Sequence, residues 1–331
     1  MGLIKLKATM AAVIAFVFGL ATLVMLGIFY LLAPNASLAT LTAGSVIIVA
    51  GIQLIQWLLG PKIIEAAYKV RPVHGRYAWV EDVVERIARE SGLSKPPKAM
   101  IAMVDVPNAF AYGNVFTGYK VAVTKGLINN LPRDEVEAVI GHEIGHIVHK
   151  DVEIMMIASI IPAILFWLGR VLMYSAWLGV GDRRSSSAAF LPLIGLGLMA
   201  FSFIFNFIIL YLSRLREYYA DSHSALVVPG GAVKLQRALA RILVASGTLK
   251  NYYPQAVASA SKFKALLIAD PEQAPPMDAD PRFVDIDRVV EWIKSRRSLT
   301  GALEIFSSHP DPAKRLRFLD ELARELGQYY A

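Results

Sequence analysis

The sequence contains no cysteine, and only 18% of its 331 residues are charged. Without cysteine the chain can form no disulfide, no thiolate metal site and no cysteine nucleophile. Soluble proteins carry about 25% charged residues, so the deficit in charge argues against an ordinary soluble enzyme. The apolar content of 55% also excludes an intrinsically disordered chain, which would be poor in apolar residues and rich in charge.

The charged residues are absent from a few long stretches of the sequence. Residues 8–61 and 185–213 contain no Asp, Glu, Lys or Arg, and residues 154–181 contain only Arg170. A helix needs about 20 apolar residues to cross about 30 Å of hydrocarbon. Since a polar turn at residues 34–37 divides the first stretch, we predict four transmembrane helices, at about 8–33, 39–60, 154–178 and 188–212.

Two of these four predictions have an alternative. The segment 8–33 could be a cleaved signal peptide, but it is longer than the apolar core of such peptides, and a second span follows almost at once. The segment 154–178 could be a buried helix of a soluble domain. Arg170 near its middle costs a few kcal/mol in a membrane, unless the side chain is paired or reaches the interface.

Basic residues beside the predicted spans indicate their orientation. Most of them flank the N-terminus, the segment after the second span and the segment after the fourth: Lys5, Lys7, Lys62, Lys69, Arg71, Arg76, Arg214 and Arg216. Arg183 and Arg184, between the third and fourth spans, are the exceptions. We therefore predict a multi-pass protein of the cell membrane whose charged segments are cytoplasmic. The net charge of +7 is then mostly juxtamembrane, and no basic-aromatic motif indicates nucleic acid.

The chain is thus predicted to alternate between membrane and soluble parts, with spans in 1–61 and 154–212 and soluble segments in 62–153 and 213–331. Hydrophobic periodicity and turn residues predict the elements of the soluble segments. These are a helix ending near Ser91-Gly92, strands at 98–104, 110–114 and 120–124, a helix over 134–149, a helix over 213–225 continuing the fourth span, and an exposed loop at 271–282. The predicted fold is an α-helical membrane protein with a mainly α, α+β cytoplasmic domain containing a small sheet.

The helix over 134–149 contains the motif His142-Glu143-Ile144-Gly145-His146. Residues i and i+4 lie on one face of a helix, a turn apart, so both imidazoles can reach one metal ion. Glu143 projects beside them, where it can act as general base on a metal-bound water. The motif predicts one Zn²⁺ per chain. Because a glycine inside a helix costs about 1 kcal/mol relative to alanine, Gly145 suggests close approach of a neighbouring backbone or of substrate.

The third zinc ligand must come from outside this motif, because catalytic zinc usually has three protein ligands and a water. The candidates are His149, His223, His309, Glu217 and Asp221. His149 is poorly directed on its helix. Glu217 and Asp221 share one helix face, so that one could bind zinc while the other orients a histidine. Spacing alone does not distinguish this role from an ordinary solvated face, and His223 stays a rival.

These motifs resemble those of the HtpX-type membrane metalloproteases, relatives of the CaaX prenyl endopeptidases. The resemblance rests on the run Val123-Thr-Lys-Gly-Leu-Ile, the HEIGH helix and the run Ser213-Arg-Leu-Arg-Glu-Tyr-Tyr-Ala-Asp221, and the order of the predicted spans extends it over nearly the whole chain. It implies a zincin-like domain in which Glu217 is the third zinc ligand and Asp221 supports the ligands.

The resemblance also implies two further functional segments. Ser308-His309-Pro310 is similar to the family's His-Pro motif, which would bring His309 to the site to stabilise the oxyanion. Residues 108–113 resemble the edge strand that holds substrate beside the zinc. The substrate-binding residues would then be Asn108, Ala109, Phe110, Ala111, Tyr112 and Gly113.

The predicted function is that of a membrane-embedded zinc endopeptidase. Its partners would be the lipid bilayer and protein substrates, held through backbone hydrogen bonds that demand little of their sequence. Unfolded or membrane-protein segments are the expected substrates, in agreement with the quality-control role that the resemblance implies. The alternatives are a prenyl-protein endopeptidase, a non-catalytic membrane zinc protein and a transporter. The last is disfavoured because the spans carry almost no ionisable residue besides Arg170.

Overall fold

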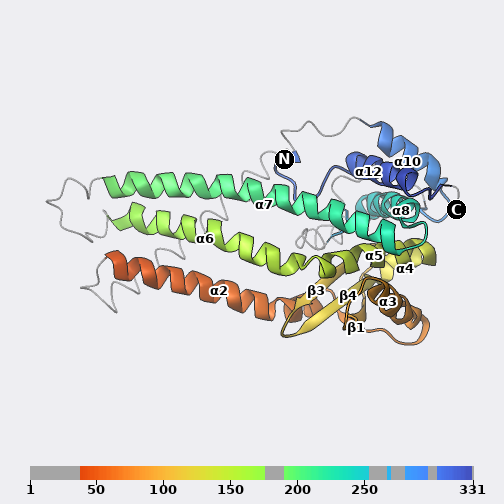
Figure 1. The fold of residues 1–331 in the computed structure, drawn as a ribbon, viewed down its shortest axis with the longest axis horizontal. Coiled ribbons are helices and arrows are strands. Elements are labelled where there is room, and N and C mark those ends of the chain that lie inside the picture. The colour runs from red at the N-terminus through yellow and green to blue at the C-terminus, as the bar shows by residue number, and fades with distance from the viewer. Residues whose placement is uncertain (1–37, 176–189, 253–266, 270–279, 297–303, 330–331) are drawn as a thin grey trace. The chain divides into compact units, whose positions relative to one another are not determined.

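The computed structural model describes residues 38–175, 190–252, 267–269, 280–296 and 304–329 (Figure 1). The predicted first span, 8–33, and most of the predicted loop 271–282 lie outside these residues. The chain divides into two compact units, which comprise residues 1–55 with 157–206 and residues 56–156 with 207–331.

Three long apolar helices contribute to the first unit: α2 (Leu38–Ala67), α6 (Asp151–Ser175) and α7 (Leu191–Val227) (Figure 1). Among the described residues, α7 and most of α6 (Asp151–Tyr174) are long and apolar enough to cross a membrane, judged by length and composition. The helix predicted over 213–225 does continue the fourth span, because α7 is unbroken to Val227. Membrane insertion itself stays a prediction.

Within the first unit, α6 and α7 approach each other at two glycines. A Cβ atom on Gly169 would collide with the carbonyl oxygen of Gly195, and a Cβ on Gly195 would collide with that of Gly169. Small residues permit such backbone contact between apolar helices. Arg170 is buried beside this contact, donates a hydrogen bond to the Tyr174 hydroxyl at 3.1 Å and lies 5.6 Å from the ring centre of Phe166. Side chains of its own helix thus give this mid-segment arginine a hydrogen-bond acceptor and an aromatic neighbour.

The second unit contains a four-stranded mixed sheet of order β1-β2-β4-β3. Its strands are β1 (Val70–Pro72), β2 (Lys98–Ala102), β3 (Ala109–Asn114) and β4 (Gly118–Thr124). β2 pairs with β4 in parallel, and the other two pairings are antiparallel. The three predicted strands are confirmed with ends shifted by up to two residues. β1 was not predicted, because three residues that include a proline carry little strand signal.

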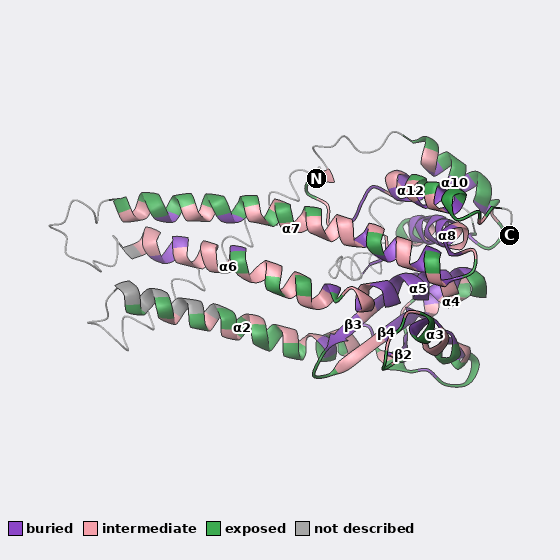
Figure 2. Ribbon diagram, in the orientation of Figure 1, coloured by how far each residue is buried: buried purple, intermediate pink, exposed green. Residues whose placement is uncertain are grey.

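Helix α5 (Arg133–Val148) lies at the centre of the second unit and is buried around most of its circumference (Figure 2). It contacts the sheet and the helices α3 (Trp79–Glu90) and α8 (Gly231–Tyr252). Its side chains Ile140 and Ile144 are fully buried, each contributing about 1.5–3 kcal/mol of hydrophobic free energy. The remaining described elements are η1 (Gly75–Tyr77), α4 (Lys125–Asn130), α10 (Ile286–Ser295) and α12 (Pro312–Glu325).

The helices predicted near 80–92 and over 134–149 are therefore confirmed as α3 and α5. Ser91 caps α3, and Gly92 follows with a positive φ of 74°, a conformation that glycine adopts without strain. The central position of α5 follows from its sequence, which is apolar on several faces. The predicted metal-binding motif thus stands on the most enclosed helix of the unit.

Candidate metal centre

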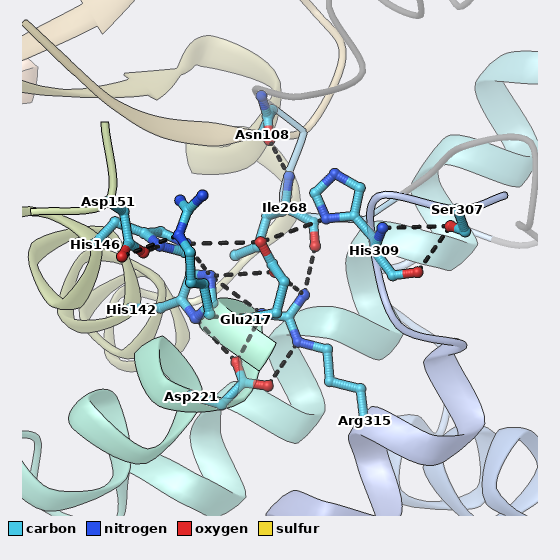
Figure 3. Close-up of polar contacts among 11 residues, drawn as sticks. Asn108, His142, His146, Asp151, Glu217, Asp221, Ile268, Ser307, His309 and Arg315 are labelled. Atoms are coloured by element: carbon cyan, nitrogen blue, oxygen red, sulfur yellow. Dashed lines mark hydrogen bonds and ion pairs between the residues drawn. The ribbon is translucent and has the colours of Figure 1, made fainter. Parts of the chain in front are cut away.

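The two histidines of the motif lie one turn apart on α5, and their Nε2 atoms are 3.1 Å apart (Figure 3). Glu217 approaches them from α7. One of its carboxylate oxygens lies 3.7 Å from Nε2 of His142, and the other lies 3.7 Å from Nε2 of His146. Within the described part of the chain, these three residues are the one group of metal-binding side chains whose donor atoms lie within 4.8 Å of one another.

This donor set suits zinc in both chemistry and spacing. Tetrahedral zinc, with bonds of about 2.0–2.1 Å, holds its ligand atoms about 3.4 Å apart. The three observed separations, 3.1, 3.7 and 3.7 Å, lie on either side of that value. Two imidazoles and one carboxylate form a known set for catalytic zinc, and they leave a fourth position for water or substrate.

Close packing of α7 against α5 brings Glu217 to the histidines. A Cβ atom on Gly145 would lie 3.0 Å from Cβ of His223 and 3.1 Å from Cα of Ala220. Two turns before Gly145 on α5, the carbonyl oxygen of Ala138 accepts a hydrogen bond of 2.6 Å from the Ser224 hydroxyl. The close approach inferred from Gly145 is therefore confirmed, and the neighbour is α7.

Each of the two histidines has its Nδ1 beside a carboxylate. Nδ1 of His142 lies 2.9 Å from Asp221. The resemblance implied that Asp221 supports the metal ligands. Nδ1 of His146 lies 2.5 Å from Asp151, which sequence reasoning had missed. Such carboxylates fix the orientation of a ligating imidazole.

Arg315 is a second residue that sequence reasoning did not assign to the site. It stands in the first turn of α12, where Asp311 caps the helix by accepting a hydrogen bond from the Ala313 N–H at 2.9 Å. The buried guanidinium donates to both oxygens of Asp221, at 2.7 and 2.6 Å, and lies 3.1 Å from a carboxylate oxygen of Glu217. Arg315 lies five residues after the His309-Pro310 motif, but its burial was not predicted because arginine is rarely buried.

Burial and these charges set the protonation states of His142 and Glu217. Burial, reinforced by Arg315, lowers the pKa of His142 to about 4. Burial raises the pKa of Glu217, but Arg315 and His309 outweigh it and hold that pKa well below its usual value. The neutral imidazole of His142 and the ionised carboxylate of Glu217 are the forms that bind a metal.

Glu143 has a different environment. Burial raises the pKa of its carboxyl group to about 7. Its Oε2 accepts a hydrogen bond of 2.8 Å from the backbone N–H of Ala111 on the edge strand β3. Because neighbouring residues of an antiparallel strand point their backbone groups to opposite sides, the groups of Ala109 and Gly113 also face away from β4. The outer edge of β3 therefore lies beside Glu143.

Asn108, directly before β3, is engaged by the chain itself. Its side-chain oxygen accepts a hydrogen bond of 2.9 Å from the N–H of Ile268, and its own N–H donates to the Thr124 hydroxyl at 2.9 Å. The carbonyl oxygen of Ile268 accepts a hydrogen bond of 2.6 Å from Arg315 (Figure 3). The segment 267–269 is thus held through both the N–H and the carbonyl oxygen of its central residue, Ile268.

Of the three histidines considered as a third ligand, one lies at the site and two do not. Nδ1 of His309 lies 3.4 Å from Glu217, and the residue is buried. Nε2 of His223 lies 2.9 Å from the Ser91 hydroxyl instead, and the ring of His149 lies 5.8 Å from that of His223. Of the rival candidates for a third ligand, the fold brings Glu217 into the donor group, whereas the ring of His223 contacts Ser91.

Comparison with known proteins agrees with this geometry. The family model described as peptidase family M48 matches residues 75–323. A protein named protease HtpX homolog from Aeropyrum pernix is 44% identical over 277 residues, which cover 83% of this chain and 84% of that protein. One of the same name from Thermoplasma acidophilum is 36% identical over 324 residues, or 96% and 97%. The crystal structure of S. mikatae Ste24p has a similar fold, with a TM-score of 0.56 and 19% identity over 96% of this chain and 67% of that one.

Proposed function

The chain belongs to peptidase family M48, and from this premise we propose that it is an HtpX-type zinc endopeptidase embedded in the cell membrane. The observation that carries the proposal is the group of His142, His146 and Glu217 with zinc-like donor separations, next to the carboxylate of Glu143. Neither a scaffold nor a transporter requires a base beside an open metal position. Hydrolysis of a peptide bond requires both.

Zinc would be held by Nε2 of His142, Nε2 of His146 and the carboxylate of Glu217. When bound, the ion supplies a Lewis acid that polarises a peptide carbonyl and makes water more acidic. The low pKa values of His142 and Glu217 keep both in their metal-binding forms at neutral pH. Asp221 would hold the imidazole of His142 through its Nδ1 and so leave Nε2 available to the ion.

Glu143 would act as the general base and then as the general acid. Its carboxylate takes a proton from the attacking water and later delivers it to the leaving amine. A pKa near 7 suits both tasks, because the group is then neither too weak a base nor too weak an acid at neutral pH. The N–H of Ala111 holds the carboxylate toward β3, where the substrate is proposed to bind.

An extended substrate would add to the sheet along the outer edge of β3. Such strand addition draws affinity from main-chain hydrogen bonds and places few demands on sequence. The six predicted substrate-binding residues would then divide into two sets. Outward backbone groups come from Ala109, Ala111 and Gly113, whereas Asn108, Phe110 and Tyr112 anchor the strand through buried side chains.

His309 is proposed to stabilise the oxyanion that develops on the substrate carbonyl. Its position supports this role, since the ring is buried and lies 3.4 Å from the carboxylate of the third ligand. The backbone before α12 carries it, and the Asp311 cap fixes where that helix begins.

The proposed setting is the cell membrane, with the active site on the cytoplasmic side and with misfolded or membrane proteins as substrates. The support is the apolar length of α6 and α7 and the exposure of their apolar side chains. Those exposed on α7 include Leu193, Ile194, Leu196, Phe203 and Ile204. An apolar surface of this extent is unfavourable in water and is typical of a surface that contacts lipid or another protein.

Glu143→Gln tests the catalytic assignment, with His149→Ala as a control near the motif but outside the donor group. Purified in detergent, the wild type and both variants are expected to hold one zinc ion per chain. Casein cleavage should fall at least about 100-fold in Glu143→Gln, as expected for loss of a general base, and should persist in His149→Ala. Cleavage by Glu143→Gln at the wild-type rate would refute the assignment, and a wild type without bound zinc would refute the metal site.

A further inference from the structure

Asp151 stands at a sharp turn directly after the metal-binding helix. Helix α5 ends at Val148, and α6 begins at Asp151. Between them Lys150 adopts a positive φ of 55°, which a residue with a side chain rarely adopts. Across this turn the Asp151 side chain reaches the His146 ring of the preceding helix (Figure 3).

The contact between Asp151 and His146 involves the nitrogen that does not face the metal. Oδ2 of Asp151 lies 2.5 Å from Nδ1 of His146, while Nε2 of the same ring points to His142 and Glu217. The carboxylate is 2% exposed and therefore scarcely competes with water for this contact. As an acceptor at Nδ1, it keeps the proton there and leaves Nε2 free to bind a metal.

The other oxygen of Asp151 is held from α7. Oδ1 lies 3.0 Å from Nε of Arg216, the residue directly before Glu217. Arg216 therefore balances the buried charge of Asp151 and fixes its position. The first ligand, His142, has a parallel arrangement, in which Asp221 accepts from the ring and Arg315 holds Asp221.

We propose that Asp151 is a positioning residue for His146, and that Arg216 acts on the metal site through Asp151. The inference rests on the metal site proposed above. Because Arg216 and Glu217 are adjacent on α7, one stretch of that helix supplies both a ligand and the support for a second ligand on α5. Removal of the Asp151 carboxylate should free the His146 ring to rotate and lower its basicity as a ligand.

The test measures zinc affinity by competition with a chelator, and it records the visible absorption spectrum of the cobalt-substituted protein. Asp151→Ala should bind zinc about 10- to 100-fold more weakly, the usual effect of removing such a carboxylate, and should alter the cobalt spectrum. Asp151→Asn keeps an acceptor oxygen without the charge, so it should lose less affinity, and it covers the case in which the alanine variant does not fold.

The matched control is Glu135→Gln. Glu135 is buried on the same helix as His146 and is paired with Arg241 at 2.9 Å, but it contacts no proposed ligand. Its variant should bind zinc with wild-type affinity. Equal losses in Asp151→Ala and Glu135→Gln would mean that any damage to the core weakens the site, and would overturn the proposal.

A double-mutant cycle tests the role of Arg216. Arg216→Gln should weaken zinc binding by itself, but it should add nothing in a chain that already carries Asp151→Ala, since residues acting in series are not additive. Additive losses would overturn the series arrangement. Wild-type affinity and an unchanged cobalt spectrum in Asp151→Ala would overturn the positioning role while leaving the metal site intact, whereas a wild type that binds no zinc would overturn both.

Discussion

Arg315→Met should severely destabilise the metal-free protein. The guanidinium is 3% exposed and bridges two buried carboxylates, Asp221 at 2.6 and 2.7 Å and Glu217 at 3.1 Å. Methionine has a similar volume but leaves both charges without this partner. Breaking a buried ion pair by removing one member costs about 3–5 kcal/mol. Loss of the hydrogen bond to the Ile268 carbonyl acts in the same direction.

The assay is the thermal unfolding midpoint in detergent at pH 8 with a chelator. A loss of 3–5 kcal/mol corresponds to roughly 6–20 °C for a domain of this size. Arg324→Met is the control on the same helix, because Arg324 is 68% exposed and its ion pair with Asp320 contributes at most about 1 kcal/mol. Added zinc should reduce the difference in midpoint between the wild type and Arg315→Met, because the ion would neutralise the carboxylate of Glu217. Equal midpoints for the two variants in chelator would refute the reasoning.

Three further predictions concern α5 and α7. In chelator, the stability of the wild type relative to Glu143→Gln should fall by up to about 3 kcal/mol as pH rises from about 4.5 to 7, because burial raises the pKa of Glu143 to about 7 and the folded state keeps a proton that the unfolded chain releases. Thermal midpoints of the two proteins over a pH series measure this difference, and parallel pH profiles would contradict the pKa. Gly145→Leu should weaken zinc binding and lower the midpoint by overpacking the α5–α7 contact, whereas Gly197→Leu, where the added side chain meets open space, should do neither. Glu217→Ala should lose more than about 100-fold in zinc affinity, beyond the effect of a supporting residue, while His223→Ala should keep it; the reverse result would make His223 the ligand.

The sequence was most informative where the chemistry is local. His142, Glu143 and His146 lie within one helix, so their spacing alone predicts their common face. The glycine between them predicted a close neighbour, and α7 is that neighbour. Glu217 is different, because its distance from the histidines depends on how α7 docks. Spacing left it beside His223 as a rival, and only the resemblance favoured it.

Two residues of the site could not be predicted from spacing. Asp151 reaches His146 across a turn in which Lys150 has a positive φ. The sequence has no glycine at that position to predict such a conformation. Arg315 is buried because two carboxylates of α7 and the carbonyl oxygen of Ile268 converge on it, and no local pattern predicts such convergence. Both depend on tertiary contacts between segments that lie apart in the chain or on opposite sides of a turn.

The glycine-lined contact between α5 and α7 has a thermodynamic consequence. The glycine backbone of α5 meets Cα and Cβ atoms of α7 there, and the positions of these atoms do not depend on side-chain rotamers. The separation between His146 and Glu217 is therefore set when the protein folds. The conformational entropy of these segments is lost in the folding step and not in the metal-binding step. An ion that binds such a preorganised site needs to order only a few side-chain torsions. Its binding free energy is therefore reduced less by ordering of the protein than it would be at a flexible site.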